Sequence, residues 1–540
     1  MLLATCFTAR ASELRAKIDQ YMRASVKVDH FMGAILVAQH GRLIVAKGYG
    51  KANLKLGIPN TPDTEFRIGS VTKEFTATAI LLLQARGKLN FEDPVCKYVP
   101  DCPADWQPIR IYNLLTHTSG IPNFTSFPNY RAVEKESITP ARLIALFKDK
   151  PLDFKPGAKF SYSNSGYEVL GYIIERVSGE SYSQFLERNI FQPLGLRATG
   201  YDSSHPAPRT HAQGYFYTPK GYEPANFVNM TVPYSAGALY STVLDLYKWD
   251  QALDAGRVLP ANLRNDMLSP HVAAGPNSHY GFGWIISSLS GHKEIWHNGG
   301  IEGFTTHNSW FPNDDAYVIV VDNMTSPDMD DIGSSLAAIL FGKRYDMPKA
   351  YTPIKLPPAT LQKYVGQYEL GPHFILTLRR TGDQLTAQGI GQQALPIFPA
   401  SKDLFFWTVV HASVSFIRDE HGQVTGLVLH QGGRAIHASR ISTNVPALPK
   451  AISLPVMVLE KYVGKYQLAP DFILTVTRAG EHLVTQATGQ GPVPIYAESQ
   501  TEFFARMIDA RITFVADSKG EITGLVLHQG GRDLPAKRLN

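Results

Sequence analysis

The sequence predicts an α/β domain followed by two small antiparallel β barrels. Two observations lead to this prediction. A strand hairpin near residue 40 and a group of strands between residues 280 and 322 enclose a mostly helical segment, so one sheet is assembled from both ends of the domain. Beyond a proline-rich segment, residues 361–434 recur as residues 459–532, each matched segment offset by 98 positions.

Helix and strand patterns place the elements of the first domain. A helical segment over residues 12–24 precedes strands 33–38 and 42–48, which form a hairpin turning at His40-Gly41. Apolar spacing and helix-start signals such as Thr242-x-x-Asp245 predict the later helices. These are expected at residues 70–86, 111–115, 165–174, 182–191, 242–249, 261–268 and 332–341, and the later strands at 280–286, 294–297, 305–311 and 316–322.

The repeated segments define the second half of the chain. Leu361 to Gly366 recurs at Leu459 to Gly464, and Gly426 to Arg434 recurs letter for letter from Gly524. Each copy alternates short apolar runs with turn residues, which predicts two antiparallel, lipocalin-like barrels. His430 and His528, identical in the two copies, are interpreted as structural. The expected domains are 12–345, 359–443 and 457–540, joined by linkers 346–358 and 444–456.

Composition excludes several classes of partner. The chain has 540 residues, a formal net charge of +5 and no run of lysine or arginine, which argues against nucleic acid or an anionic membrane. No apolar run is long enough to cross a bilayer. Residues 1–11 have the pattern of the end of an export signal and predict a periplasmic or secreted protein. Cys96 and Cys102 are close enough in sequence for a local disulfide, with two unpaired thiols as the alternative.

The segment from Arg67 to Phe75 carries the strongest catalytic signal. Lys73 follows Ser70 by three residues at the start of an apolar helix that Gly87 ends, so a nucleophile and a potential base share one helical face. Desolvation lowers a lysine pKa, and free N–H groups at a helix start can stabilise an oxyanion. Taken alone, the motif also fits a serine that only caps a helix. A second Ser-x-x-Lys at residues 290–293 has no helix after it and is interpreted as a chance match.

Two other stretches offer side chains to a cleft. Tyr162 and Asn164 lie on a tight connection just before a helix, which Ser165-x-x-Glu168 is expected to open as a capping box. After strand 294–297, Gly299-Gly300 lets another backbone approach closely.

His117 is interpreted as structural, and a metal site near His297 is considered but not expected. His117 lies at a helix end among capping residues. His292, Glu294 and His297 are of metal-ligand type, but on a strand residues 292 and 294 face away from 297. We therefore predict neither a metal site nor a cofactor.

Three of these segments together carry a family resemblance. Ser70-Val71-Thr72-Lys73, Tyr162-Ser163-Asn164 and His297-Asn298-Gly299, in this order, resemble the three motifs of the class C β-lactamase and penicillin-binding-protein family. The resemblance covers about residues 12–343 and implies an antiparallel sheet flanked by helices, with a helical region as the other wall of the cleft.

The resemblance also implies roles for these residues. Ser70 would be the acylated nucleophile and Lys73 its proton partner. Tyr162 would be the base or relay that protonates the leaving group, and a cation at Lys73 would favour its phenolate. Asn164 would orient Lys73 and the substrate. His297 of the third motif is counted with these residues as a candidate catalytic residue. The N–H groups of Ser70 and Gly300, beside Gly299, would form the oxyanion hole.

The third motif bears on the substrate. Many β-lactamases of the family have lysine where this chain has His297, which is mostly neutral at pH 7 and binds a carboxylate weakly. The resemblance is therefore to D-aminopeptidases, related peptidases and some esterases, with the D-aminopeptidase layout of a catalytic domain plus two barrels. We expect a serine hydrolase, a peptidase or amidase acting on short peptides that can contain D-residues. The alternatives are a carboxylesterase, a β-lactamase or D,D-carboxypeptidase, and a penicillin-binding sensor without turnover; the motifs set no oligomeric state.

Overall fold

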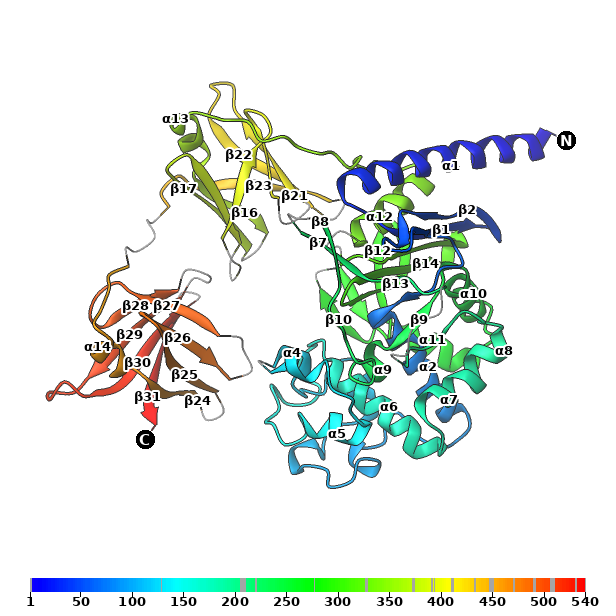
Figure 1. Ribbon diagram of the computed structural model, residues 1–540, viewed down its shortest axis with the longest axis horizontal. Helices are drawn as coiled ribbons and strands as arrows, with labels where there is room; N and C mark the ends of the chain where they lie inside the picture. The colour runs from blue at the N-terminus through cyan, green and yellow to red at the C-terminus, as the bar shows by residue number, and fades with distance from the viewer. Residues whose placement is uncertain are drawn as a thin grey trace. The chain divides into compact units, whose positions relative to one another are not determined.

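The chain forms two compact units, Met1–Ala350 and Tyr351–Asn540. We describe it from a computed structural model (Figure 1). The described residues are 2–127, 129–203, 210–218, 221–275, 277–325, 329–371, 374–389, 392, 394–408, 412–431, 434–445, 451–469, 472–488, 492–505, 510–529 and 532–539.

One antiparallel sheet of eight strands organises the N-terminal unit, in the order β10-β11-β12-β13-β14-β15-β1-β2. Strands from the two ends of the domain meet where β1 pairs with β15, for example at Gly33 and Asp322, so the predicted assembly from both ends is confirmed. The predicted strand 280–286 is wrong, because the segment turns at Gly283, whose φ is +79°. The strands are β1 Gly33–Gln39, β2 Arg42–Tyr49, β10 Val272–Gly275, β11 Ser278–Tyr280, β12 Ile285–Leu289, β13 His292–Ile301, β14 Phe304–Phe311 and β15 Ala316–Asp322.

Helices cover both faces of this sheet (Figure 1). Side chains alternate along β1, so Ile35 and Val37 pack with α1 and α12 while Leu36 and Ala38 join the core around α2 and α6. The longer helices are α1 Leu2–Val28, α2 Thr72–Ala85, α6 Asn164–Ser178, α10 Val243–Asp254, α11 Ala261–Met267 and α12 Met329–Leu340. The shorter ones are α3 Ile111–Leu115, α4 Tyr130–Val133, α5 Pro140–Ala145, α7 Tyr182–Leu186, α8 Gln192–Leu194 and α9 Tyr234–Gly237.

Three small sheets lie among the helices of the N-terminal unit. The sheet β5-β9-β6 lies just before the Ser70 segment, since Arg67 of β5 pairs with Tyr240 of β9. The strands are β3 Lys51–Asn53, β4 Ile58–Pro59, β5 Phe66–Arg67, β6 Gly200–Tyr201, β7 Tyr215–Thr218, β8 Gly221–Pro224 and β9 Leu239–Ser241.

Helix ends test the predicted caps. The Thr242 side chain accepts a hydrogen bond from Asp245 N–H at 3.1 Å, as expected for the N-cap of α10. The capping box at Ser165 is wrong, because α6 starts at Asn164 and Ser165 Oγ donates instead to Pro122 O at 2.7 Å. Ser165 therefore bonds to a residue distant in sequence instead of capping α6, although its spacing from Glu168 is typical of a capping box.

The C-terminal unit contains two closed antiparallel barrels, as predicted. Equivalent positions repeat the same contacts: Tyr368 Oη donates to Tyr364 O and Tyr466 Oη to Tyr462 O, both at 2.8 Å. The first barrel has β16 Gly366–Gly371, β17 Phe374–Thr381, β18 Gln384–Gly389, β19 Leu395–Pro399, β20 Leu404–Phe406, β21 Ala412–Arg418, β22 Val424–Gln431 and β23 Arg434–Ser442. The second has β24 Gly464–Ala469, β25 Phe472–Ala479, β26 His482–Ala487, β27 Val493–Ala497, β28 Glu502–Ala505, β29 Ala510–Ala516, β30 Ile522–Gln529 and β31 Arg532–Leu539. Short helices α13 Pro358–Leu361 and α14 Val456–Glu460 precede them.

The repeated histidines make cross-strand contacts. His430 Nε2 lies 3.2 Å from Ser415 Oγ, and His528 Nε2 lies 3.0 Å from Thr513 Oγ1. The repeated glycines 432–433 and 530–531 lie outside the described residues.

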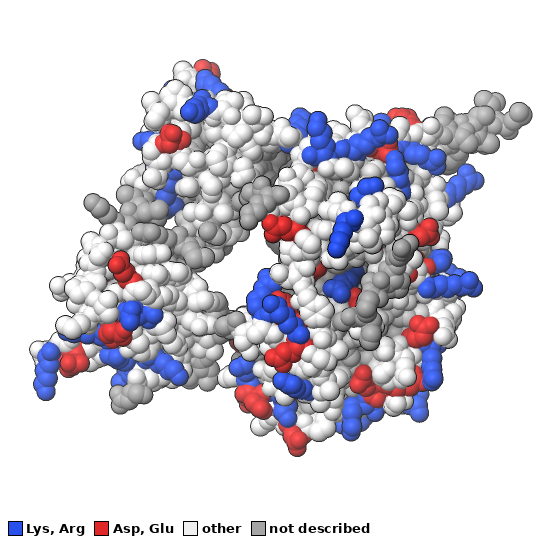
Figure 2. All heavy atoms as spheres, viewed as in Figure 1, with Lys and Arg blue, Asp and Glu red and all other residues white. Residues whose placement is uncertain are grey.

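Two further sequence predictions concern the surface and the cysteines. Cys96 and Cys102 form a disulfide, which decides between the two alternatives. Basic and acidic side chains both occur across the face of the N-terminal unit seen in Figure 2. Among the helices described, none is long and apolar enough to span a membrane.

Candidate active site

Ser70 lies in a 3₁₀ turn, Gly69–Val71, that leads directly into α2. The turn needs a left-handed residue, which Gly69 supplies with φ of +51°. One helical turn on, the buried Lys73 donates from Nζ to Ser70 Oγ at 3.1 Å. The same Nζ donates to Asn164 Oδ1 at 2.9 Å and to Ala236 O at 2.8 Å, so each of the three protons of the ammonium has a hydrogen-bond acceptor. The predicted pair is therefore assembled on one helical face, held by α6 and α9.

Burial changes the acid–base character of Lys73. Desolvation lowers the pKa of Lys73 to about 7, and the Glu168 carboxyl opposes this shift. A lysine with this pKa is half neutral near pH 7. Its neutral amine can accept the Ser70 proton, which an ordinary lysine cannot do.

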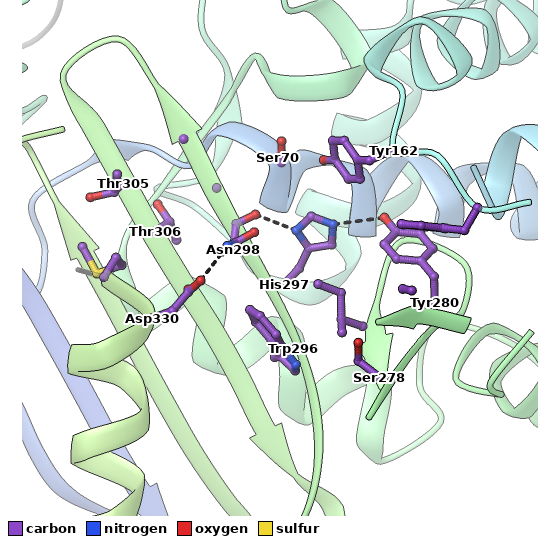
Figure 3. Close-up of a pocket in the computed structure, with 16 residues that line it drawn as sticks. Ser70, Tyr162, Ser278, Tyr280, Trp296, His297, Asn298, Thr305, Thr306 and Asp330 are labelled. Atoms are coloured by element: carbon purple, nitrogen blue, oxygen red, sulfur yellow. Dashed lines mark hydrogen bonds between the residues drawn. The ribbon is translucent and has the colours of Figure 1, made fainter. Parts of the chain in front are cut away.

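Tyr162 lies across the cleft, with its hydroxyl directed toward Ser70 (Figure 3). That hydroxyl is buried and has no hydrogen-bond partner at normal distance among the described residues. Burial raises the pKa of Tyr162 above its usual value, and the Ser70 hydroxyl opposes the rise by less. The expected phenolate is thus disfavoured, although Lys73 Nζ lies 4.9 Å from the Tyr162 ring centroid. Beneath the ring packs His117, at 4.3 Å between centroids, whose Nδ1 accepts from Ser163 N–H at 3.2 Å.

Strand β13 forms the opposite wall, and its backbone touches the Gly69–Val71 turn. A Cβ on Gly299 would lie 2.0 Å from Ile68 O and 3.0 Å from Ser70 N, and a Cβ on Gly69 would lie 2.8 Å from Gly300 N. Only glycine permits this approach. It places the backbone of Gly299 and Gly300 against the turn that contains Ser70, where the predicted oxyanion hole would lie.

His297 is buried and neutral. Its Nε2 lies 3.0 Å from Tyr280 Oη and its Nδ1 lies 2.6 Å from Asn298 O (Figure 3). Since a carbonyl only accepts, Nδ1 carries the proton and Nε2 accepts from Tyr280. Desolvation and the Lys73 charge lower the pKa of His297 to about 3. A neutral His297 offers no charge to a substrate carboxylate.

The other residues considered as metal ligands do not join His297. His292 pairs with Asp314 at 3.0 Å, and Glu294 accepts from Ser287 at 3.0 Å. Of the second Ser-x-x-Lys, Ser290 lies in the turn between β12 and β13 and Lys293 lies in β13, so its interpretation as a chance match fits the structure.

Two cavities meet at Ser70 and Gly300. The larger, about 510 Å³, has Tyr162, Tyr280, Trp296, His297, Asn298 and Asp330 in its wall. The smaller, about 170 Å³, has Tyr130, Glu134, Asn164, Glu168, Ile301 and Glu302 in its wall. Ser70 therefore has a distinct space on each side.

Sequence reasoning missed several of these residues. Asp330, at the start of α12, accepts from Asn298 Nδ2 at 2.8 Å and pairs with His307 Nδ1 at 3.0 Å. Burial opposes its ionisation, but the contacts with His307 hold the pKa of Asp330 below its usual range. An acidic residue in the first turn of a helix is too common to signal such a role. Tyr280 was expected only as a strand residue, but its hydroxyl lies 3.0 Å from His297 Nε2.

Comparison with known proteins agrees with this geometry. Residues 16–340 match the family described as Beta-lactamase, and residues 351–440 and 448–538 each match a domain of unknown function (DUF3471). Penicillin-binding protein PbpX of Bacillus subtilis is 34% identical over 322 residues, covering 59% of this chain and 78% of that protein. A teichoic acid D-alanine hydrolase of Staphylococcus aureus is 29% identical over 307 residues, covering 56% of this chain and 72% of its own.

A solved structure shares the fold as well. The D-stereospecific amidohydrolase from Streptomyces sp. is 29% identical with a TM-score of 0.54, and the match covers 61% of this chain and 99% of that one. The Beta-lactamase match spans more than half of the sequence and contains Ser70, Lys73, Tyr162 and His297. With the Ser70 turn, the buried Lys73 and the glycine-containing strand in place, this chain is a serine hydrolase that belongs to the beta-lactamase family.

Proposed function

We propose that the chain hydrolyses amide bonds of small peptides through an acyl-enzyme on Ser70. The observation that carries this proposal is the 3.1 Å contact between Lys73 Nζ and Ser70 Oγ, with Lys73 desolvated and its pKa near 7. Such a pair supplies both nucleophile and base without a further histidine.

The reaction proceeds in two steps. Neutral Lys73 Nζ accepts the Ser70 proton while Oγ bonds to the substrate carbonyl carbon, and the N–H groups of Ser70 and Gly300 stabilise the oxyanion. Collapse of the tetrahedral intermediate breaks the C–N bond. The leaving nitrogen takes a proton from the Tyr162 hydroxyl, and the Lys73 ammonium then returns a proton to Tyr162. A water molecule then attacks the ester, releases the acid and restores the Ser70 hydroxyl. The raised pKa of Tyr162 suits a proton donor and relay better than a resting base.

The residues that line the larger cavity support a substrate whose leaving group has no carboxylate. Its described wall contains Asp330 and neutral His297 but neither lysine nor arginine. A β-lactam or a peptide C-terminus would bring a carboxylate to this cavity, where Asp330 repels it. The names of two relatives, a D-stereospecific amidohydrolase and a teichoic acid D-alanine hydrolase, support acyl groups with D-configuration.

The proposal also includes where the protein acts. The Cys96–Cys102 disulfide supports an oxidising compartment, hence the periplasm or the exterior of the cell.

The test compares initial rates on D-alanine p-nitroanilide and on a short-chain p-nitrophenyl ester. We expect both to be hydrolysed, with Ser70→Ala losing at least a thousandfold in each case. Ser290→Ala, which alters the second Ser-x-x-Lys in a surface turn, is the matched control and keeps full activity. Ester turnover without anilide cleavage would favour the carboxylesterase, because activated esters need no leaving-group protonation. Activity that survives Ser70→Ala would disprove the assignment of the nucleophile.

A further inference from the structure

Glu168 lies in α6, one helical turn after Asn164, and is 1% exposed. Its Oε2 accepts a hydrogen bond from Ser235 N–H at 3.2 Å, whereas its Oε1 has no hydrogen-bond partner among the described residues. A buried carboxyl with an unsatisfied oxygen lowers the stability of the folded protein. Core packing alone therefore does not account for a glutamate at this position.

The segment that Glu168 contacts, α9, is held by the helices on both sides of it. On the α6 side, a Cβ on Gly171 would lie 2.0 Å from Ser235 Oγ, so glycine is needed where the two helices touch. On the α2 side, Thr76 Oγ1 donates to Ser235 O at 2.7 Å. Tyr234, the first residue of α9, has a φ of +25°, which is strained for a residue with a side chain. Contacts with α2 and α6 thus hold α9 in a strained conformation.

The residue after Ser235 presents its carbonyl to the amine of Lys73. The acceptors of Lys73 Nζ are Ser70 Oγ, Asn164 Oδ1 and Ala236 O. The two carbonyl oxygens can only accept hydrogen bonds, whereas the serine hydroxyl can also donate one. When the ammonium loses a proton, its two remaining N–H groups therefore stay on the two carbonyl oxygens. The nitrogen lone pair then faces the Ser70 hydroxyl, as the proposed reaction requires.

We infer that Glu168 is a positioning residue for Lys73: it holds α9, and with it the Ala236 carbonyl that orients the amine, and it brings a negative charge near that amine. The inference rests on the acyl-enzyme proposed above, in which Lys73 accepts the Ser70 proton. Because Glu168 is buried, it acts through α9 and through its charge and not by contact with the reacting atoms.

The charge of Glu168 acts on the ionisation of Lys73. Desolvation lowers the pKa of Lys73 to about 7, and the Glu168 carboxyl opposes this shift by favouring the ammonium. Burial raises the pKa of Glu168 in turn, and the Lys73 charge and the hydrogen bonds from Ser235 oppose that rise. Without the Glu168 charge, the pKa of Lys73 should therefore be lower still.

Other titratable groups also face these two side chains. They are His117, His297, Tyr130, Tyr162, Tyr167, Tyr182 and Tyr201. Burial lowers the pKa of both histidines and raises the pKa of all five tyrosines, so that these groups are uncharged near pH 7. Glu134 and Glu302, in the wall of the smaller cavity, pair with Arg131. We therefore expect a change in the Lys73 ionisation to report on Glu168.

Two substitutions in the full-length protein separate the hydrogen bond from the charge, with kcat/KM on p-nitrophenyl propionate measured across pH. Glu168→Gln keeps an oxygen for Ser235 N–H but removes the charge. It should retain at least a tenth of the wild-type plateau, and its rising limb should move about half a pH unit to lower pH. Glu168→Ala releases α9, so its plateau should fall at least a hundredfold.

Two further variants serve as controls. Thr76→Val removes the other hydrogen bond to the Ser235 backbone without changing a charge, so the plateau should fall about tenfold while the rising limb stays at the wild-type pH. Glu136→Gln removes the charge of a surface glutamate paired with Arg142 and should change neither the plateau nor the limb.

Two outcomes would overturn the inference. One is a rising limb that Glu168→Gln leaves at the wild-type pH, and the other is a wild-type plateau in a Glu168→Ala protein that melts like the wild type. If Glu168→Ala does not fold, the pH profile of Glu168→Gln decides. Lys73→Ala separates this inference from the proposed function. If it loses activity while the Glu168 variants behave like the wild type, only the role of Glu168 is wrong; if it keeps full activity, the proposed base is wrong and the role of Glu168 with it.

Discussion

Gly299 and Ile68 are in direct backbone contact, since a Cβ on Gly299 would lie 2.0 Å from Ile68 O. Gly300 is the next residue in β13, yet a Cβ placed there meets nothing within 4 Å. The first glycine is required by packing, and the second leaves space for the substrate.

This difference predicts opposite results for two adjacent substitutions. Gly299→Ala should push β13 away from the Ser70 turn, lowering Tm and reducing kcat/KM on p-nitrophenyl propionate at least a hundredfold, because the oxyanion donors separate. Gly300→Ala should melt like the wild type and lose less than tenfold on this small substrate. Wild-type activity in Gly299→Ala would contradict the contact.

The pH profile should report the ionisation of Lys73. Because the active amine is unprotonated, log kcat/KM on a neutral ester should rise with a slope of 1 below pH 7 and level off above the pKa of about 7. Lys73→Ala should lose at least a thousandfold. A rising limb near pH 10 would mean that Lys73 keeps an ordinary pKa and that another group is the base.

Tyr162→Phe should separate amide from ester substrates. Without the phenolic proton, expulsion of an amine slows by about 10²–10⁴-fold, the usual contribution of a general acid. A p-nitrophenolate needs no proton, so the ester should lose much less. Equal losses on both substrates would indicate that Tyr162 acts on Ser70 itself rather than on the leaving group.

A carboxylate on the leaving group should be disfavoured. With Asp330 in the wall of the larger cavity and His297 neutral, alanyl-alanine amide should be cleaved about tenfold better than alanyl-alanine, a difference of about 1.4 kcal/mol. Benzylpenicillin should acylate Ser70 slowly, as mass spectrometry of the intact protein can show. Faster cleavage of the free acid would require a cation that the described wall lacks.

Much of the fold and the centre of the site could be predicted because their signals are local. Ser70 and Lys73 share one helical turn, and the segments repeated at an offset of 98 residues predict two similar barrels. Contacts between distant segments carry no such signal. Glu168 has the spacing of a capping residue, but its carboxyl accepts a hydrogen bond from Ser235 N–H of α9. Asp330 lies at the site only because α12 brings it to Asn298 of β13 and His307 of β14. The two cavities that meet at Ser70 and Gly300 likewise arise from several elements at once.

A buried acidic pair beneath the site should make stability depend on pH. Asn308 Nδ2 donates to Asp250 Oδ1 at 3.0 Å and to Glu74 at 3.3 Å, and Asp250 Oδ2 has no partner among the described residues. Burial raises the pKa of both carboxyls above their usual range, and the Asp250 charge raises that of Glu74 further.

The sign of this dependence follows from linkage. Above about pH 4 the unfolded chain releases both protons, while the folded chain retains at least one, so the stabilisation is complete below pH 4 and is lost as pH rises toward the raised pKa values. Tm of the N-terminal unit should therefore fall between pH 5 and pH 8. Asp250→Asn removes one titrating group and keeps its shape, so calorimetry should show a smaller fall than in the wild type or in the exposed control Asp149→Asn. Parallel curves for all three proteins would mean that the pair is ionised in the folded state.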